Sequence, residues 1–277
     1  MTSPSALFFA AIHRRLMNDD AAPPRDASSA PTPHSRGDGA DLVGAARDYL
    51  RGLSDGGGEP PWPPTLARQK EGLRRWATRL GLELNAGDIL PRLVRGGQEH
   101  DWYREGERIV KVTRHGVFGH SPGIELALVS SSQDARHFHL WEATPLEYLE
   151  RLHLQNELTA GLNAFEGVIV QAGEEMAIVT SQPRFDLVPV TTAEIDTWFA
   201  TLGFEKITDA AYYRAEDNLG IFDAHDKNLV RAGDVLVPFD VIPCRPAGGF
   251  LKFIEDTLAA GHSLRAVRTV TTKGGAA

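Results

Sequence analysis

The chain has 277 residues, 42% of them hydrophobic, with a formal net charge of −8 and one cysteine. This length supports one full hydrophobic core and a small accessory one, rather than several domains. The acidic balance argues against general nucleic-acid binding, which needs a basic surface. The lone Cys244 excludes an intramolecular disulfide, fits a cytoplasmic protein and is predicted to be a buried small residue rather than a nucleophile.

Residues 1–61 are predicted to be a largely disordered extension. Residues 18–41 contain no Val, Ile, Leu, Met, Phe, Trp or Tyr, so apolar burial cannot offset the entropy of ordering them. A weak helix is expected at about 42–53, before the glycine- and proline-rich run at 56–61. The apolar run at 6–12 is shorter than the roughly 20 residues of a membrane helix, and its basic residues follow it, unlike those of a signal peptide. We expect no membrane association.

Residues 62–89 are predicted to form an accessory helix that packs on a first lobe. Between residues 64 and 84 the apolar side chains recur at helical spacing: Leu66, Leu73, Trp76, Leu80 and Leu82.

A glycine turn and a lysine-bearing strand follow. The segment Leu90–Tyr103, continued by Arg108–Thr113, predicts a strand, a turn at Gly96 and Gly97, a second strand, a turn and a third strand. Lys111 lies inside the third strand, where apolar residues alternate. Taken alone, Lys111 is better explained as a surface lysine on an edge strand.

The next predicted elements are a helix, a hairpin and a second helix. Thr144 is the expected N-cap of a helix to Leu158, with Pro145 at its first position. Residues 165–170 and 176–180 predict a hairpin that leads into Ser181, Gln182 and Pro183. Residues 191–200 predict a short capped helix at the start of a second lobe.

An acidic loop carries the main chemical signal. Asp223 follows the apolar run 219–222, Asn228 comes five residues later, and Asp240 follows the apolar run 235–239. We predict that these two runs pair as a hairpin that brings Asp223 and Asp240 to one end. In phosphoryl transfer one carboxylate handles the proton of the nucleophile, while an amide and a second carboxylate bind Mg²⁺. Asp223 would be the base, and Asn228 and Asp240 would hold the metal, although the spacing alone also fits an ordinary polar loop.

The order of glycine turn, lysine, helix, hairpin, acidic loop and second acid is that of the protein-kinase superfamily. The sequence resembles in particular the kinase-like domain of bacterial and phage polyvalent proteins, over roughly residues 90–245. The residues that carry this resemblance are Gly97–His100, Val110–Thr113, Thr144–Leu149 with Asn156, Val179–Pro183, and Asp223–His225 with Asn228 and Asp240. The Asp223–Asn228 loop is also similar to the catalytic loop of HipA-type toxin kinases, which phosphorylate a protein serine.

The resemblance implies an α+β, compact two-lobed protein-kinase-like fold. Its N-lobe, with an antiparallel sheet, would occupy residues 90–182. A reduced C-lobe with the catalytic and metal loops would occupy residues 183–262, before a mobile tail at 263–277. We expect the disordered extension and the accessory helix to precede these lobes.

The resemblance also implies ATP binding. Lys111 would contact the α and β phosphates and act in catalysis with Asp223, and Gly96 and Gly97 would let backbone amides approach the phosphates. The hinge would offer backbone groups to adenine. Its residues would be Thr180, Ser181 and Gln182. A helix glutamate would pair with Lys111, and three candidates stay open: Glu147, Glu150 and Glu157.

These features predict an ATP- and Mg²⁺-dependent phosphotransferase acting on a hydroxyl of an unidentified protein or small molecule. The alternative is a pseudokinase or a nucleotide-binding interaction module of a phage or mobile element. The joint presence of Lys111, Asp223, Asn228 and Asp240 favours the active enzyme. No His-Arg-Asp precedes the loop and no glycine follows Asp240, so the activation-segment switch of eukaryotic kinases is not expected.

Overall fold

The computed structural model describes residues 39–54, 64–126, 136–170, 175–185, 188–233 and 235–260. The chain divides into two compact units, one of residues 1–116 with 152–184 and one of residues 117–151 with 185–277. Helices and antiparallel sheets occur in the described part, which confirms the predicted α+β class. The kinase-like two-lobed arrangement stays a prediction. Of the segment predicted to be disordered at 18–41, residues 18–38 lie outside the described residues, as does the tail predicted to be mobile at 263–277, whereas residues 39–41 belong to a helix.

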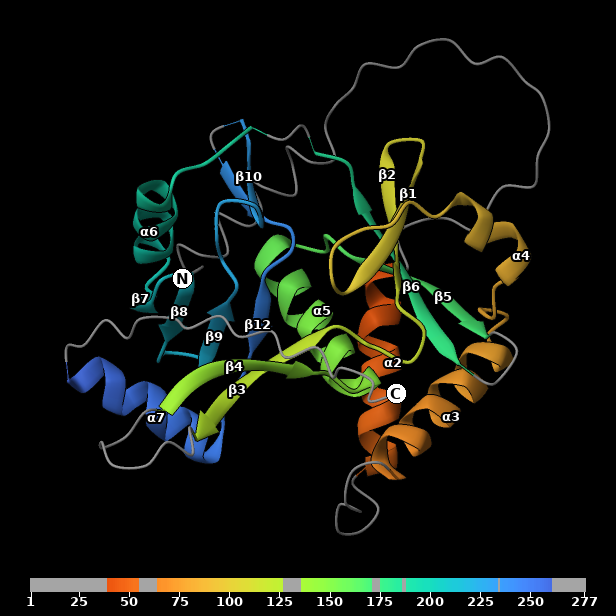
Figure 1. The fold of residues 1–277 in the computed structure, drawn as a ribbon, viewed down its shortest axis with the longest axis horizontal. Coiled ribbons are helices and arrows are strands. Elements are labelled where there is room, and N and C mark those ends of the chain that lie inside the picture. Colours follow the sequence, from red (N-terminus) through yellow and green to blue (C-terminus); the bar gives the residue numbers. More distant parts are fainter. Residues whose placement is uncertain are drawn as a thin grey trace, which may run out of the picture. The chain divides into compact units, whose positions relative to one another are not determined.

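The first unit is built on a four-stranded antiparallel sheet in the order β1-β2-β6-β5 (Figure 1). Its strands are β1 (His100–Glu105), β2 (Arg108–Thr113), β5 (Ala164–Val170) and β6 (Met176–Pro183). Residues of alternating position on these strands form a buried cluster: Tyr103, Val110, Val112, Ile169, Ala177 and Val179, with Ile89. The hairpin predicted at 165–170 and 176–180 is confirmed, and β6 continues to Pro183.

Helices α2 (Gly39–Ser54) and α3 (Pro64–Arg79) both contact β5. The rings of Trp76 and Phe165 meet edge to face with centroids 5.6 Å apart. The helix predicted at 42–53 is therefore confirmed, and it begins three residues earlier, at Gly39.

The chain after α3 extends the sheet beyond β5. The N–H of Leu84 donates to the carbonyl of Val168 at 2.8 Å, and the N–H of Val168 donates to that of Leu82 at 2.9 Å. Gly167, with φ +153°, lies at this contact, and a Cβ there would be 2.2 Å from the Leu82 carbonyl oxygen. Only glycine fits this close approach.

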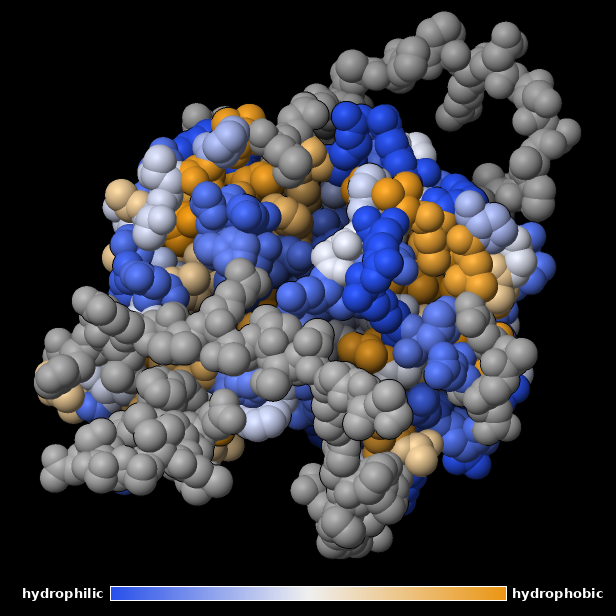
Figure 2. All heavy atoms as spheres, in the orientation of Figure 1, coloured by the Kyte–Doolittle hydropathy of each residue, from blue (hydrophilic) through white to orange (hydrophobic). Residues whose placement is uncertain are grey.

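The strand predicted to open the Leu90–Tyr103 segment is wrong. The chain instead forms the short helix α4 (Ala86–Ile89) and the 3₁₀ turn η1 (Leu90–Arg92), and strand pairing is limited to one bridge between Val94 and Trp102. Asn85 caps α4 by accepting the N–H of Gly87 at 2.9 Å, and Pro91 has no N–H to give a strand ladder. Apolar side chains reach the surface beside α4 (Figure 2), and Val94 is exposed.

The second unit contains the hairpin of β3 (His120–Leu126) and β4 (Arg136–Glu142), the first turns of α5 (Pro145–Thr159), and the helices α6 (Thr192–Thr201) and α7 (Gly248–Ala259). Two capping boxes explain where α5 and α6 begin. Glu147 and Thr144 exchange backbone and side-chain hydrogen bonds of 2.7 and 3.2 Å, and Thr191 and Glu194 do the same. The helices predicted at 144–158 and 191–200 are confirmed.

A second four-stranded antiparallel sheet in this unit has the order β12-β9-β8-β7. Its strands are β7 (Glu205–Thr208), β8 (Ala211–Arg214), β9 (Leu219–Phe222) and β12 (Ile242–Cys244), and a separate hairpin joins β10 (Leu229–Ala232) to β11 (Val235–Pro238). The predicted pairing of 219–222 with 235–239 is wrong, because β11 pairs with β10 while β9 pairs with β12. Asp223 and Asp240 are nevertheless close, as predicted. Ile242 is opposite Phe222, so residues 240 and 241 lie beside the end of β9.

No described helix is both long enough and apolar enough to cross a membrane.

Candidate functional site

Asp223 stands at the end of a fully buried strand. All four residues of β9 are buried, and Asp223 then turns the chain with φ +56°, a left-handed conformation that is unusual for a residue other than glycine. The N–H of Ala224 donates to the carbonyl of Ala210 at 2.9 Å and fixes the turn to the neighbouring strand connection. The Asp223 side chain is 23% exposed. A polar group therefore reaches solvent directly from a rigid strand.

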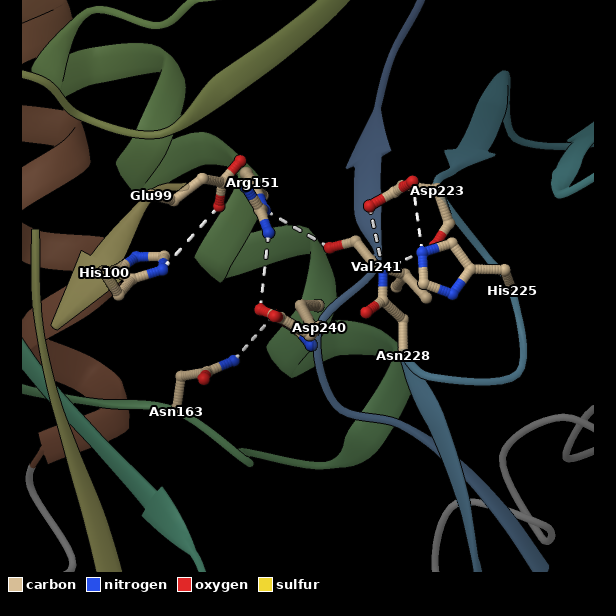
Figure 3. Close-up of polar contacts among 10 residues, drawn as sticks. Glu99, His100, Arg151, Asn163, Asp223, His225, Asn228, Asp240 and Val241 are labelled. Carbon is tan, nitrogen blue, oxygen red and sulfur yellow. Dashed lines mark hydrogen bonds and ion pairs between the residues drawn. The ribbon is translucent and has the colours of Figure 1, made fainter. Parts of the chain in front are cut away.

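Asn228 is bound to Asp223. Its Nδ2 donates to the Asp223 carbonyl oxygen at 2.7 Å and to Oδ2 of the Asp223 carboxylate at 2.8 Å (Figure 3). The residue is 8% exposed. Because the amide nitrogen is committed to Asp223, Oδ1 is the atom through which Asn228 would bind a cation.

The backbone of the same residue positions Asp240. The carbonyl of Asn228 accepts the N–H of Phe239 at 3.1 Å and that of Asp240 at 3.3 Å. The pairing of β9 with β12 holds the following residues in register. The structure thus brings together three of the predicted site residues, Asp223, Asn228 and Asp240, within the second unit.

Arg151 is a site residue that the sequence did not reveal. It lies on α5, is 5% exposed, and its Nε donates to the Val241 carbonyl at 3.2 Å, while Nη2 is 3.6 Å from Oδ1 of Asp240 (Figure 3). The helical phase contained a signal, because Arg151 lies three residues after buried Tyr148 and four before buried Gln155. A buried arginine requires partners of this kind.

His225 completes the loop. Its Nδ1 accepts the N–H of Lys227 at 3.1 Å, so the ring proton is on Nε2, which is 3.5 Å from Oδ1 of Asp223. The sequence placed His225 in the loop without a role. The structure places its ring beside the Asp223 carboxylate.

Lys111 and the glycines belong to the first unit, whereas Asp223 belongs to the second. Lys111 lies on β2 opposite Trp102 on one side and Thr180 on the other. The N–H of Gly96 donates to the Asp101 carboxylate at 3.1 Å, and a Cβ at Gly96 would be 2.2 Å from the His100 carbonyl oxygen. Gly96 is therefore explained by the close packing of the turn itself.

Gly97 has different surroundings. A Cβ at this position would meet no atom within 4 Å. Its backbone is therefore the part of the turn that a phosphate could approach, and its carbonyl accepts a hydrogen bond from the Arg114 guanidinium.

The predicted hinge residues lie on β6. Thr180 and Ser181 pair with β2 on one side and β5 on the other, whereas Gln182 pairs with Ile109 of β2 alone. The Ser181 hydroxyl accepts two hydrogen bonds from Arg108, of 2.9 and 2.7 Å, and donates to Glu166. Of the three predicted hinge residues, Gln182 is therefore the one that pairs with a strand on one side instead of two.

The three glutamates proposed as partners of Lys111 differ in their contacts. Glu147 is used in the α5 capping box, and Oε1 of Glu157 is 3.2 Å from Nε2 of His153. These contacts do not decide which of the three glutamates pairs with Lys111. Near the glycine turn, Nδ1 of His100 is 3.7 Å from Oε2 of Glu99, which gives these two residues a contact but no chemical role.

The donor set fits a magnesium ion. Mg²⁺ takes hard oxygen ligands, commonly one or two carboxylates with water and phosphate oxygens completing the octahedron. Among the described residues, no cluster of three or more His, Cys, Asp or Glu could hold a metal. Cys244 takes no part, because burial raises the pKa of its thiol to about 12 and keeps it protonated.

The geometry defines a class of site in which a strand-end carboxylate, a buried amide and a second carboxylate are held together, as in phosphoryl-transfer enzymes. Residues 127–243 match the family model described as Serine/Threonine/Tyrosine Kinase found in polyvalent proteins. The predicted resemblance to that family is therefore confirmed over this range, which contains Asp223, Asn228, Asp240 and the predicted hinge. Gly96, Gly97 and Lys111 lie outside it. Searches of curated proteins and of solved structures found no match.

Proposed function

We propose that the protein is an ATP- and Mg²⁺-dependent phosphotransferase that transfers the γ-phosphate to a hydroxyl of a protein or a small molecule, in the cytoplasm. The observation that carries the proposal is the double hydrogen bond from Asn228 to Asp223, together with the Asp240 amide on the Asn228 carbonyl. This arrangement holds a base and two metal ligands as one rigid group. The family match over residues 127–243 supports the same class of reaction.

Asp223 is the general base in this proposal. Its carboxylate would accept the proton of the attacking hydroxyl while Asn228 and His225 fix its orientation. The left-handed backbone at Asp223 supports this role, because strained residues cluster where a side chain must be aimed.

Asn228 and Asp240 would hold Mg²⁺, which supplies positive charge to the phosphate oxygens when bound. Arg151 is the positioning residue for Asp240, since it contacts both that carboxylate and the next carbonyl along the chain. In the first unit, Lys111 and the backbone at Gly97 would bind the phosphates, and the end of β6 from Gln182 onward would receive the adenine.

Magnesium-dependent nucleotide binding tests these assignments. We expect ATP with Mg²⁺ to raise the unfolding temperature of the wild type, and Asp240→Asn to abolish the magnesium-dependent part of that rise. Asp226→Asn is the matched control, because Asp226 is in the same loop with a side chain 61% exposed. An unchanged response of Asp240→Asn would refute the metal assignment.

The phosphate contact of Lys111 has its own test. Lys111→Met should weaken binding of ATP more than binding of adenosine, because only ATP presents phosphates to the lysine. Equal weakening of both ligands would instead show that the substitution perturbs β2.

A further inference from the structure

Gln182 carries an amide oxygen with no hydrogen-bond partner. The residue is 4% exposed, and its Oε1 is buried without a partner in the part of the chain that the structure describes. Nearly all buried polar atoms in proteins are paired, because an unpaired one loses its water without compensation. Such an atom leaves an acceptor that a bound ligand could satisfy.

The neighbouring residue shows that this is not a general defect of the strand. Ser181 is 2% exposed and its hydroxyl is fully used, with two hydrogen bonds from Arg108 and one to Glu166. Successive strand residues point to opposite faces. The unpaired oxygen therefore belongs to the other face of the sheet.

That face is the one that carries Lys111. Residues directly opposite on paired strands share a face, so Lys111 shares its face with Thr180, and Gln182, two residues further along β6, does as well. Lys111 and Gln182 are diagonal neighbours, at about 7–8 Å for such pairs. A ligand with a phosphate end and a flat polar end could contact both side chains.

At Gln182 the strand has a strand partner on one side only among the described residues. Ser181 pairs with both Val110 and Ala164, whereas Gln182 pairs only with Ile109 in the described sheet.

We propose that Gln182 is a base-recognition residue whose side-chain oxygen accepts a hydrogen bond from the exocyclic 6-amino group of adenine. A glutamine amide presents one acceptor and one donor in a plane, which matches the adenine edge of one amino donor and one ring-nitrogen acceptor. This assignment rests on the proposed function. It differs from the predicted hinge role, in which only backbone groups contact the base.

Two nucleotides and three variants test the assignment. Binding of ATP and of purine riboside triphosphate, which lacks the 6-amino group, is measured by titration calorimetry with Mg²⁺. The wild type should prefer ATP by roughly threefold to tenfold, the range of one hydrogen bond. Gln182→Met should remove this preference, whereas Gln182→Glu, which retains an acceptor oxygen, should keep it.

The unfolding temperature of the variants without nucleotide is a second test. If Gln182 had only a structural role, Gln182→Met would lower this temperature. Gln182→Met removes an unsatisfied buried oxygen, so we expect the unfolding temperature without nucleotide to rise. The matched control is Gln155→Met: Gln155 is 2% exposed, and its Oε1 accepts from Asn163 Nδ2 at 3.0 Å. Its substitution should lower the unfolding temperature and leave the preference for ATP intact.

The possible outcomes distinguish base recognition by Gln182 from the proposed phosphotransferase function. If Gln182→Met keeps the preference for ATP, or destabilises the protein as Gln155→Met does, base recognition by Gln182 is overturned while the proposed function stands. If the wild type binds neither nucleotide, both are overturned.

Discussion

Replacing Asn228 by Asp reverses the polarity of the contact that organises the site. Asn228 Nδ2 makes one hydrogen bond to a carboxylate and one to a carbonyl. Hydrogen bonds to charged groups contribute about 1.5–3 kcal/mol and neutral ones about 0.5–1.5 kcal/mol. Losing both should lower the free energy of unfolding by about 2–4.5 kcal/mol. Asn228→Asp also places two carboxylates in contact, so its loss should lie at the upper end or beyond.

The pH dependence distinguishes this mechanism from simple loss of packing. In the folded Asn228→Asp protein, repulsion from Asp223 should raise the pKa of the new carboxyl group, so the folded state binds more protons than the unfolded state. Stability relative to the wild type should therefore recover as the pH falls from 7.5 to 5. Asn228→Ala removes the same two donors without adding a charge, and its deficit should not depend on pH.

Urea denaturation of the three proteins, compared at each pH, measures these differences. The account would be refuted if Asn228→Asp were as stable as the wild type at pH 7.5. It would also be refuted if both variants showed the same deficit at both pH values, since the deficit would then come from packing.

Three further predictions concern other parts of the chain. Gly167→Ala should lower the free energy of unfolding by more than about 2 kcal/mol, because its Cβ would overlap the Leu82 carbonyl. Gly249→Ala is the control and should be tolerated, because a Cβ there would meet no atom within 4 Å. Thermal denaturation of both variants measures the difference. Burial, and then the nearby Arg47, lower the pKa of His153. The folded state therefore binds fewer protons, so stability should fall as the pH drops below about 6.5, the unfolded value. His153→Gln should flatten that slope in denaturation curves from pH 7.5 to 5.5, and an unchanged slope would place its origin elsewhere. Arg151→Met should weaken Mg²⁺-dependent ATP binding in calorimetry more than Arg151→Lys, which retains a charge near Asp240; equal binding by both would remove the positioning role.

The features that the sequence predicted correctly were those set by local chemistry. Thr144 with Glu147 and Thr191 with Glu194 are capping pairs that are visible within four residues, and both helices begin where these pairs predict. The pairing of β5 with β6 joins segments that are equally close in the sequence. The incorrect predictions concerned strand pairing between segments that are not adjacent in the sequence. Nothing near residues 219–222 indicates that their partner is the three-residue strand β12 rather than the more apolar β11.

The candidate site divides in the same way. Asp223, Asn228 and Asp240 were predicted from residue type and spacing, and their proximity did not depend on the wrong hairpin. Arg151 could not be assigned, because its partners Asp240 and Val241 lie about ninety residues further along the chain. The role of Gln182 depends on a missing hydrogen bond, which only coordinates reveal.

Transfer of the γ-phosphate is the measurement that tests the central claim most directly. Purified protein is incubated with γ-labelled ATP and Mg²⁺, with and without cell lysate, alongside Asp223→Asn and the exposed-loop control Asp226→Asn. The account predicts labelling of the protein, of a lysate protein or of a small metabolite by the wild type and the control. Asp223→Asn should bind ATP normally but transfer about 10²–10⁴-fold more slowly, the usual contribution of a general base. No transfer by the wild type despite ATP binding would contradict the account and indicate a nucleotide-binding module, and equal transfer by Asp223→Asn would show that Asp223 is not the base.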